Sequence, residues 1–249
     1  MLESAPARVP IRREVVSYVR RGSRLNPAQE RAWTRLRDRY VVDLPHGERH
    51  TELADQACVD WSAVFGRTAP LLVEIGTGAG EALAALAASH PHADVVGFEV
   101  FYPGVASTLS RLRRAEVANA RIVLADGAQA LAKLFGPRSV AEVWTFFPDP
   151  WHKTRHHKRR LVSADFARLV ASRLVSGGRW RLATDWADYA EWMRAICDAE
   201  PGLANEHDGW APRWDERPVT KFEQRGIDAG RRIYDLSYRA QRTGERMLG

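Results

Sequence analysis

Acidic side chains recur where the predicted strands of this chain end. Glu74, Glu99, Asp126, Asp149 and Asp185 each lie at or just beyond the end of an apolar, strand-like run. Parallel strands bring their carboxyl ends to one edge of a sheet, where open α/β sheets bind ligands. Five carboxylates along one edge repel each other unless a ligand relieves the repulsion. This spacing predicts a binding site for a cationic or hydroxyl-rich ligand.

The turn after the first of these strands contains three glycines, Gly76, Gly78 and Gly80, which let a ligand approach the backbone where the next helix begins. The third glycine comes one residue too early for the dinucleotide-binding fingerprint. Glu99 follows Gly80 by 19 residues, where a carboxylate can accept hydrogen bonds from both ribose hydroxyls. Glu74 adds negative charge where a pyrophosphate would lie. The pattern therefore favours an adenosine-bearing cofactor with a sulfonium and an amino group over NAD.

Asp149 lies between two prolines, at the end of the strand-like run 141–147. Pro148 and Pro150 fix their own φ angles and disfavour helical geometry at the residues before them. We therefore expect Phe147 and Asp149 to be extended, and the turn to present one acid with little backbone freedom.

Positive charge is concentrated in two segments of the chain. Residues 152–160 contain five Lys and Arg residues and no acid, and residues 8–39 contain ten arginines against three acids. The net charge is +6, so the remainder of the chain is acidic. Two basic segments on an acidic protein predict a polyanionic partner such as a nucleic acid. Neither segment has a broad apolar face opposite its charges, which disfavours a membrane partner.

The elements that must position these residues alternate along the chain. Asn26 and Pro27 predict the start of a helix that ends near Tyr40. From residue 70 onward, strands alternate with helices, which predicts a doubly wound, mostly parallel, Rossmann-like α/β sheet. The predicted strands span 71–75, 94–100, 121–125, 141–147 and 179–184, and the predicted helices span 81–89, 103–116, a segment ending at 135, 163–174 and 189–199.

The two ends of the chain differ in character. The segment 233–239 alternates apolar and polar residues, as expected for an antiparallel edge strand. Residues 1–20 are polar and basic, and we expect them to form a disordered N-terminal extension. Residues 21–249 are expected to form one domain with a helical N-terminal segment.

Composition excludes several classes of protein. The apolar fraction of 45% and the charged fraction of 27% are ordinary for a globular chain. No run of about 18 apolar residues is present, so we expect a cytoplasmic protein without a membrane partner. Cys58 and Cys197 form no spaced pair, and His152, His156 and His157 have no acid or cysteine beside them, so we expect no metal site.

These motifs together resemble those of the bacterial tRNA (guanine-N7-)-methyltransferases, which are class I S-adenosylmethionine-dependent enzymes. The resemblance covers most of residues 17–240. Its most specific part is the stretch 147–160, with the pattern F-P-D-P-W-x-K-x-R-H-x-K-R-R, whereas the glycine turn is shared by many methyltransferases. The other matching segments are 18–21, 74–80, 97–100, 119–126, 184–185 and 220–226.

The resemblance implies methylation of N7 of guanine 46 in the tRNA variable loop, and it implies roles for individual residues. Asp149 would be the catalytic acid. S-adenosylmethionine would be held by Glu74, Gly76, Gly78, Gly80, Glu99, Asp126 and Asp149. The substrate would be contacted by Lys153, Asp185, Thr220, Lys221, Phe222 and Glu223. RNA would be bound by Arg20, Arg21, Arg155, His156, His157, Lys158, Arg159 and Arg160.

Guanine N7 has an in-plane lone pair, so no proton has to leave the attacking atom. Catalysis would then rest on placing N7 in line with the sulfonium methyl group. Asp149 would stabilise the positive charge that develops on the base, and Asp149, Asp185 or both would accept hydrogen bonds from the guanine N1 and N2 hydrogens. Three alternatives remain open at this point: an NAD(P)-dependent oxidoreductase, a non-catalytic RNA-binding module and a small-molecule methyltransferase.

Overall fold

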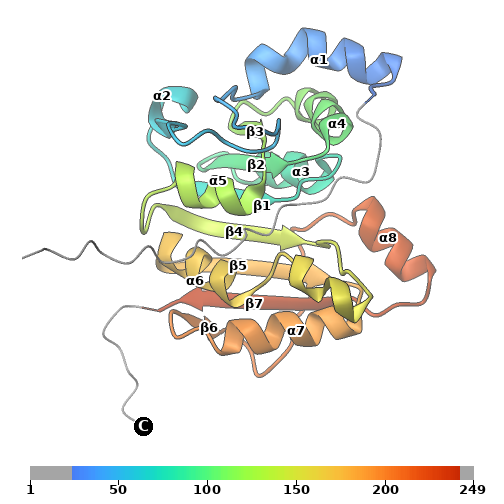
Figure 1. Cartoon of the computed structure of the whole chain (residues 1–249). Helices are drawn as coiled ribbons and strands as arrows, with labels where there is room; N and C mark the ends of the chain where they lie inside the picture. Colours follow the sequence, from blue (N-terminus) through green and yellow to red (C-terminus); the bar gives the residue numbers. More distant parts are fainter. Residues whose placement is uncertain (1–23, 242–249) are drawn as a thin grey trace, which may run out of the picture.

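The computed structural model describes residues 24–241 and places seven strands in one sheet (Figure 1). The strand order is β3-β2-β1-β4-β5-β7-β6. The strands β1 to β5 run parallel, and β7 and β6 pair antiparallel at one end of the sheet. The predicted doubly wound, mostly parallel sheet with an antiparallel edge is confirmed. The predicted N-terminal extension, residues 1–20 with Arg20, lies outside the described residues, and so does Arg21.

Parallel strands and helices alternate as the sequence predicts. The parallel strands are β1 (Leu71–Ile75), β2 (Asp94–Glu99), β3 (Ala120–Leu124), β4 (Val140–Phe146) and β5 (Leu174–Thr184). The helices that follow them are α3 (Glu81–Ser89), α4 (Tyr102–Arg114), α5 (Gly127–Leu134), α6 (Ala164–Arg173) and α7 (Ala187–Asp198). The predicted bounds match to the residue for β1 and α3.

β5 begins at Leu174, five residues before its predicted start at 179. The glycine pair at 177–178 predicts a turn, but the strand runs through it, with Gly177 at a φ of +79°. The pairing of β5 with β4 shifts register between Val140 and Glu142. Pairing with β4 therefore keeps this segment in the sheet, and the glycine accommodates the irregularity.

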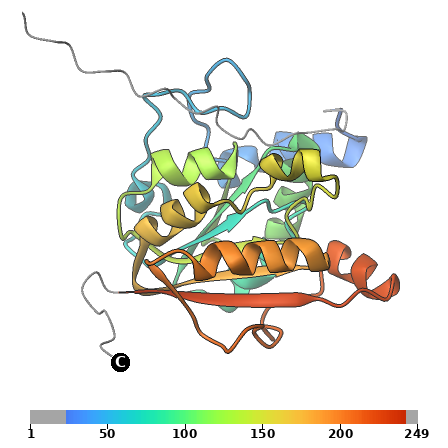
Figure 2. The ribbon, with the colours of Figure 1, turned by 60° about the horizontal axis from the view of Figure 1, so that its bottom comes forward.

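Two groups of helices cover the two faces of the sheet. Helices α5, α6 and α7 pack on one face against residues such as Val73 and Val96, and Figure 2 shows α7 alongside β7. Helices α3 and α4 pack on the other face against residues such as Leu72 and Val95. Because neighbouring residues of a strand point to opposite faces, the central strands are buried on both sides and contain nearly continuous apolar runs.

The antiparallel end of the sheet has one strand more than the sequence predicts. β7 (Tyr234–Ala240) pairs with β5 on one side and with β6 (Leu203–Asn205) on the other. The predicted C-terminal edge segment is therefore flanked on both sides, and the three-residue β6 is the outermost strand. A strand this short has no periodicity from which to predict it.

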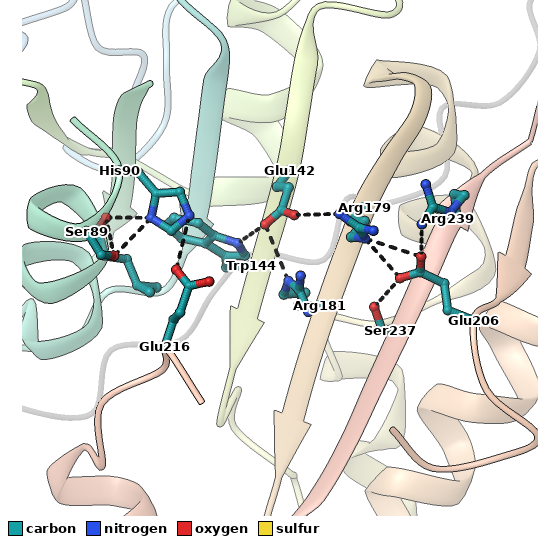
Figure 3. Close-up of polar contacts among 11 residues, drawn as sticks. Ser89, His90, Glu142, Trp144, Arg179, Arg181, Glu206, Glu216, Ser237 and Arg239 are labelled. Carbon is teal, nitrogen blue, oxygen red and sulfur yellow. Dashed lines mark hydrogen bonds and ion pairs between the residues drawn. The ribbon is translucent and has the colours of Figure 1, made fainter. Parts of the chain in front are cut away.

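Charged side chains lie side by side across β4, β5 and β7 (Figure 3). Glu142 of β4 lies 3.9 Å from Arg179 and 3.4 Å from Arg181 of β5. Arg179 and Arg239 of β7 both pair with Glu206. Opposite charges therefore alternate across the strands, which stabilises this part of the sheet.

Helix α1 (Pro27–Tyr40) begins where the sequence predicts, at a capping box. The Asn26 side chain accepts hydrogen bonds from the N–H groups of Ala28 and Gln29, and the Gln29 side chain accepts one from the Asn26 N–H. The Gln29 amide also donates to the Pro103 carbonyl and the Ser107 hydroxyl. The start of α1 is thereby fixed to the start of α4.

Three short helices complete the described chain: α2 (Trp61–Phe65), the 3-10 helix η1 (Thr154–Arg159) and α8 (Lys221–Asp228). The sequence leaves the segment 50–64 open between a helix and an irregular structure, and predicts neither η1 nor α8. Figure 1 shows α8 beyond the carboxyl ends of β4 and β5. None of the helices in residues 24–241 is long and apolar enough to cross a membrane.

Candidate active site

The strand order switches between β1 and β4, which are hydrogen-bonded neighbours in the centre of the sheet. The helix after β1, α3, covers one face, and the helix after β4, α6, covers the other. Ligands of doubly wound sheets bind at the carboxyl ends of the strands at such a switch point. Glu74 lies near the end of β1, and Asp149 lies three residues beyond β4. Two of the predicted acids therefore flank this point.

The three glycines after β1 adopt positive φ angles of 81° at Gly76, 58° at Gly78 and 79° at Gly80. A Cβ atom at Gly80 would lie 2.5 Å from the Thr108 side chain, so this glycine allows α3 to pack against α4. A Cβ atom at Gly76 would meet no atom within 4 Å. The turn therefore leaves open space beside the end of β1, as a ligand site requires.

Glu74 is 3% exposed, and its Oε2 atom has no hydrogen-bond partner among the described residues. Burial, together with the nearby charge of Glu99, raises the pKa of Glu74 to about 8. A buried carboxyl group with an unpartnered oxygen can receive a cationic group, which would stabilise its charged form. This environment fits the ammonium and sulfonium groups of S-adenosylmethionine.

Glu99 ends β2 and fixes the glycine turn to it. Its carboxylate accepts hydrogen bonds from the N–H groups of Gly78 at 2.6 Å, Val100 at 2.7 Å and Phe101 at 2.8 Å. Burial raises the pKa of Glu99, and these backbone hydrogen bonds oppose that rise. Each carboxylate oxygen has two lone pairs, so Glu99 can still accept from ribose hydroxyls.

Two of the other acids have partners within the protein. Asp126 caps α5, where its Oδ1 atom accepts hydrogen bonds of 3.1 Å from the N–H groups of Ala128 and Gln129. Asp185 forms an ion pair with Arg231 at 2.8 Å. These partners within the protein offset part of the repulsion that the sequence suggests among the five acids.

Asp149 lies on an exposed turn between β4 and η1. Phe147 has a φ of 51° and Trp151 a φ of 46°, so residues in left-handed geometry flank the acid. The prediction that Phe147 is extended is wrong, because its N–H donates to the Ala183 carbonyl of β5 at 2.7 Å and the chain turns there. Such backbone strain occurs preferentially at functional sites.

The predicted basic segment forms η1, and most of its cations reach the surface. The Arg159 guanidinium lies 5.1 Å from the Trp151 ring centroid, and the His156 ring meets the edge of the same indole at 5.7 Å. These contacts hold Trp151 against η1. The predicted substrate-binding or RNA-binding side chains that are exposed or half-buried here are Lys153, Arg155, His156, His157, Lys158 and Arg159.

Arg160 differs from the rest of this segment because it is only 1% exposed. Its Nε atom donates to the Pro150 carbonyl at 3.0 Å, and its Nη2 atom pairs with Asp188. Its guanidinium also lies 4.9 Å from the ring centroid of Tyr189 and 5.2 Å from that of Trp192. The Arg160 side chain is therefore engaged within the protein, and its burial argues against the predicted RNA contact.

Helix α8 brings two predicted substrate residues to the glycine turn. The Lys221 N–H donates to Glu81 of α3 at 2.6 Å. Phe222 is 48% exposed, and its ring lies 3.4 Å from the position that a Cβ atom on Gly78 would occupy. The start of α8 therefore lies directly beside the candidate cofactor site.

The other two predicted residues of this motif serve the fold. Glu223 is fully buried and pairs with Arg213 at 2.8 Å and Arg217 at 3.3 Å, so its carboxylate is engaged within the protein, and its contact with substrate stays a prediction. Thr220 is 8% exposed, and its hydroxyl caps α8 by accepting from the Glu223 N–H. Of the four predicted substrate residues in this motif, Lys221 and Phe222 are the two with exposed side chains.

Sequence reasoning missed several partners of the predicted residues, because each lies far away along the chain. Glu81 precedes Lys221 by 140 residues, and Arg231 follows Asp185 by 46. Arg217 gives no signal in the sequence beyond its charge. In the part of the chain that the structure describes, no group of three or more His, Cys, Asp or Glu side chains could hold a metal ion.

Two solved structures share this fold at low sequence identity. The 16S rRNA methyltransferase KamB has a TM-score of 0.55 and 16% identity, and the match covers 81% of this chain and 100% of KamB. The 16S rRNA (adenine(1408)-N(1))-methyltransferase from Catenulisporales acidiphilia has a TM-score of 0.52 and 18% identity, with coverages of 80% and 99%. At these identities the match establishes the fold alone.

Similarity in sequence is much closer. A family model described as a putative methyltransferase matches residues 68–236. The chain is 54% identical to a tRNA (guanine-N(7)-)-methyltransferase of Cutibacterium acnes, over 92% of this chain and 84% of the relative. Proteins of the same name from Nocardioides sp. and Thiobacillus denitrificans are 53% and 46% identical, over 91% and 92% of this chain and 88% and 96% of the relatives. The chain therefore belongs to the tRNA (guanine-N(7)-)-methyltransferase family.

Proposed function

We propose that this protein transfers the methyl group of S-adenosylmethionine to N7 of a guanine in tRNA, with position 46 of the variable loop as the expected site. One observation carries the proposal: the open glycine turn and the exposed acid Asp149 flank the same switch point of the sheet. The basic helix η1 follows Asp149 directly in the chain. The names of the relatives in the family agree with this activity. The sheet and its helices act as one methyltransferase domain, and a cytoplasmic location goes with the tRNA substrate.

The cofactor would lie against the glycine turn. Bound S-adenosylmethionine supplies an electrophilic methyl group on a sulfonium. Glu74 would receive positive charge at its unpartnered Oε2 atom, and the open space beside Gly76 would accommodate the ligand. Glu99 would accept hydrogen bonds from the ribose hydroxyls. Asp126 follows β3, the strand next to β2, and would form the edge of the cofactor site on that side.

Asp149 would orient the guanine and stabilise the positive charge that N7 methylation creates on the base. No proton has to be removed from N7, so the acid acts by hydrogen bonding and electrostatics and not as a general base at that atom. The guanine N1 and N2 hydrogens are donors that a carboxylate can accept. Asp185, which Arg231 holds in place, offers a second carboxylate at the same edge of the sheet.

The tRNA backbone would be bound by the exposed cations that follow this acid. Arg155 and Lys158 project from η1, and phosphate contacts of this kind set the register of the bound RNA. Lys153 directly precedes η1, and Lys221 and Phe222 begin α8 beside the glycine turn, so all three would contact the substrate. Phe222 would offer an aromatic surface to the flipped or exposed base.

The test is methyl transfer to unmodified tRNA from S-adenosylmethionine labelled in the methyl group. After nuclease digestion, mass spectrometry should find the label in 7-methylguanosine, and mapping should place it in the variable loop. Label in another nucleoside, or none, would refute the proposed activity. NAD should not bind under conditions in which S-adenosylmethionine does, as measured by calorimetry.

A further inference from the structure

The turn that presents Asp149 is strained at both ends. Among the described residues, four positions other than glycine have a positive φ, and two of them, Phe147 and Trp151, flank this acid. Left-handed geometry is unfavourable for aromatic residues and persists only where surrounding contacts impose it. Contacts at both ends of the turn must therefore hold it in this shape.

Arg217 provides the contact at the start of the turn. Its side chain is fully buried, and its guanidinium lies 5.2 Å from the Phe146 ring centroid and 5.3 Å from the Phe147 ring centroid. Its Nη2 atom pairs with Asp235 of β7 at 2.9 Å and with Glu223 of α8 at 3.3 Å. One cation thereby joins the end of β4 to the start of β7 and to α8.

Arg160 provides the contact at the other end of the turn. Its Nε atom donates to the carbonyl of Pro150, the residue directly before Trp151. Asp188 and the rings of Tyr189 and Trp192, all on α7, surround its guanidinium. The end of the turn is thereby fixed to α7, on the opposite face of the sheet from α3 and α4.

Both arginines are energetically expensive where they lie. The Nε and Nη1 atoms of Arg217 and the Nη1 atom of Arg160 are buried without a hydrogen-bond partner in the described chain. Apolar residues of similar volume commonly serve stability as well as or better than buried charge pairs. A contribution to stability therefore does not explain why arginines occupy these two positions. A role in holding the turn between them does.

We propose that Arg160 and Arg217 are positioning residues that hold the two ends of the Phe147–Trp151 turn and so fix Asp149 relative to the glycine turn and α8. The inference rests on the proposed function of Asp149. Arg217 also aligns α8 through Glu223, and α8 in turn contacts the glycine turn through Phe222. Both guanidinium groups are buried within the protein, so neither is exposed for tRNA to bind.

The test uses variants that remove each guanidinium together with the charge of one carboxylate partner. These variants are Arg160→Met with Asp188→Asn, and Arg217→Met with Asp235→Asn. The single-turnover rate at saturating tRNA and cofactor should fall about 10- to 100-fold, because misplacement of a reacting group by about 1 Å has effects of this size. The dissociation constants of tRNA and S-adenosylmethionine should stay within about threefold of the wild-type values.

Arg121→Met is the matched control. Arg121 is half-buried, and like the other two arginines it lies over an aromatic ring, 4.8 Å from the Phe65 centroid. It donates to the backbone carbonyls of Ala120 and Val64, but it lies on β3, away from the turn. This variant should lose stability and keep the wild-type rate when assayed below its melting temperature. The lysine variants Arg160→Lys and Arg217→Lys keep the charge without the planar fork and should recover only part of the rate.

Three results would overturn the inference. An unchanged rate in folded arginine variants would leave these residues a purely structural role. Weaker tRNA binding with a shallower salt dependence and an unchanged maximal rate would make Arg160 an RNA contact after all. The lysine variants replace the methionine variants in this test if the latter do not fold. Full activity of both lysine variants would refute the requirement for the planar guanidinium group at these two positions.

A readout independent of activity separates this inference from the proposed function. Protein labelled with 5-fluorotryptophan gives a fluorine NMR resonance for Trp151, which Trp151→Phe assigns. That resonance should shift in both double variants and stay in place in Arg121→Met. If the wild-type protein methylates no tRNA, the proposed function is refuted. If the Trp151 resonance does not shift in the double variants, the positioning role of the two arginines is refuted, whatever the activity of the protein.

Discussion

Binding of S-adenosylmethionine is expected to displace a proton from Glu74. Burial and the nearby Glu99 raise the pKa of Glu74 to about 8, so at pH 7 about 90% of the cofactor-free molecules have this carboxyl group protonated. A cationic ligand group at the Oε2 atom favours the charged form and lowers that pKa. Relative to a variant without this carboxyl group, the protein should release about 0.9 proton per cofactor at pH 7 and about 0.1 at pH 9.

The same pKa makes the stability of the cofactor-free protein depend on pH. Folding favours the protonated form, because the folded-state pKa of about 8 lies above the ordinary value of 4.5. Compared with a Glu74 side chain that stayed charged at every pH, the protonated side chain stabilises the folded protein. This contribution to the free energy of unfolding is complete below pH 4.5 and is lost as the pH rises to 8. The loss amounts to about 5 kcal/mol across that window. Urea unfolding of the wild-type protein and of Glu74→Gln at several pH values measures it.

Isothermal titration calorimetry measures the proton release directly. The observed binding enthalpy is determined at pH 7 and pH 9 in buffers with different ionisation enthalpies, and the slope against the buffer enthalpy gives the number of protons. Glu74→Gln keeps the shape of the side chain and removes its titration, so it corrects for protons that come from the cofactor itself. Equal slopes for the two proteins at pH 7 would refute the assignment of Glu74 as the group that receives the cofactor charge.

Three further substitutions test other parts of the site. Asp149→Ala should lower turnover by about 10²-fold or more while calorimetry finds cofactor affinity within about threefold of wild type, and normal turnover would remove this acid from the chemistry. The double charge reversal Arg155→Glu and Lys158→Glu should weaken tRNA binding and reduce the slope of log affinity against log salt by about 1 to 2, so an unchanged slope would place η1 outside the interface. Gly80→Ala should destabilise the protein by about 2–4 kcal/mol, because a Cβ atom at a φ of 79° would lie 2.5 Å from Thr108; a loss below about 0.5 kcal/mol in urea unfolding would contradict this packing.

The regular part of the fold could be predicted because its signals are local. The apolar run 71–75 and the alanine-rich segment 81–89 become β1 and α3 with the predicted bounds, and Asn26 caps α1 as its position before Pro27 predicts. The three glycines also form the predicted turn, and each adopts a positive φ angle. Hydrophobic periodicity and capping act within a few residues, so the sequence alone contains them.

The direction of individual charged side chains could not be predicted, because it depends on partners far along the chain. Arg160 belongs to a run of cations and was expected at the surface, but Asp188 and the α7 aromatic rings bury it. Glu223 matches a substrate motif, yet Arg213 and Arg217 enclose it. Phe147 precedes a proline and was expected to be extended, and a hydrogen bond to β5 overrides that preference.

Replacement of a single atom, guanine N7, tests most directly whether this protein methylates that atom in tRNA. Two transcripts of the same tRNA are compared, one with guanosine and one with 7-deazaguanosine, in which a C–H group replaces N7. We predict that the guanosine transcript accepts the labelled methyl group and that the 7-deazaguanosine transcript binds with similar affinity but accepts none. Methyl transfer to the 7-deazaguanosine transcript would contradict the account.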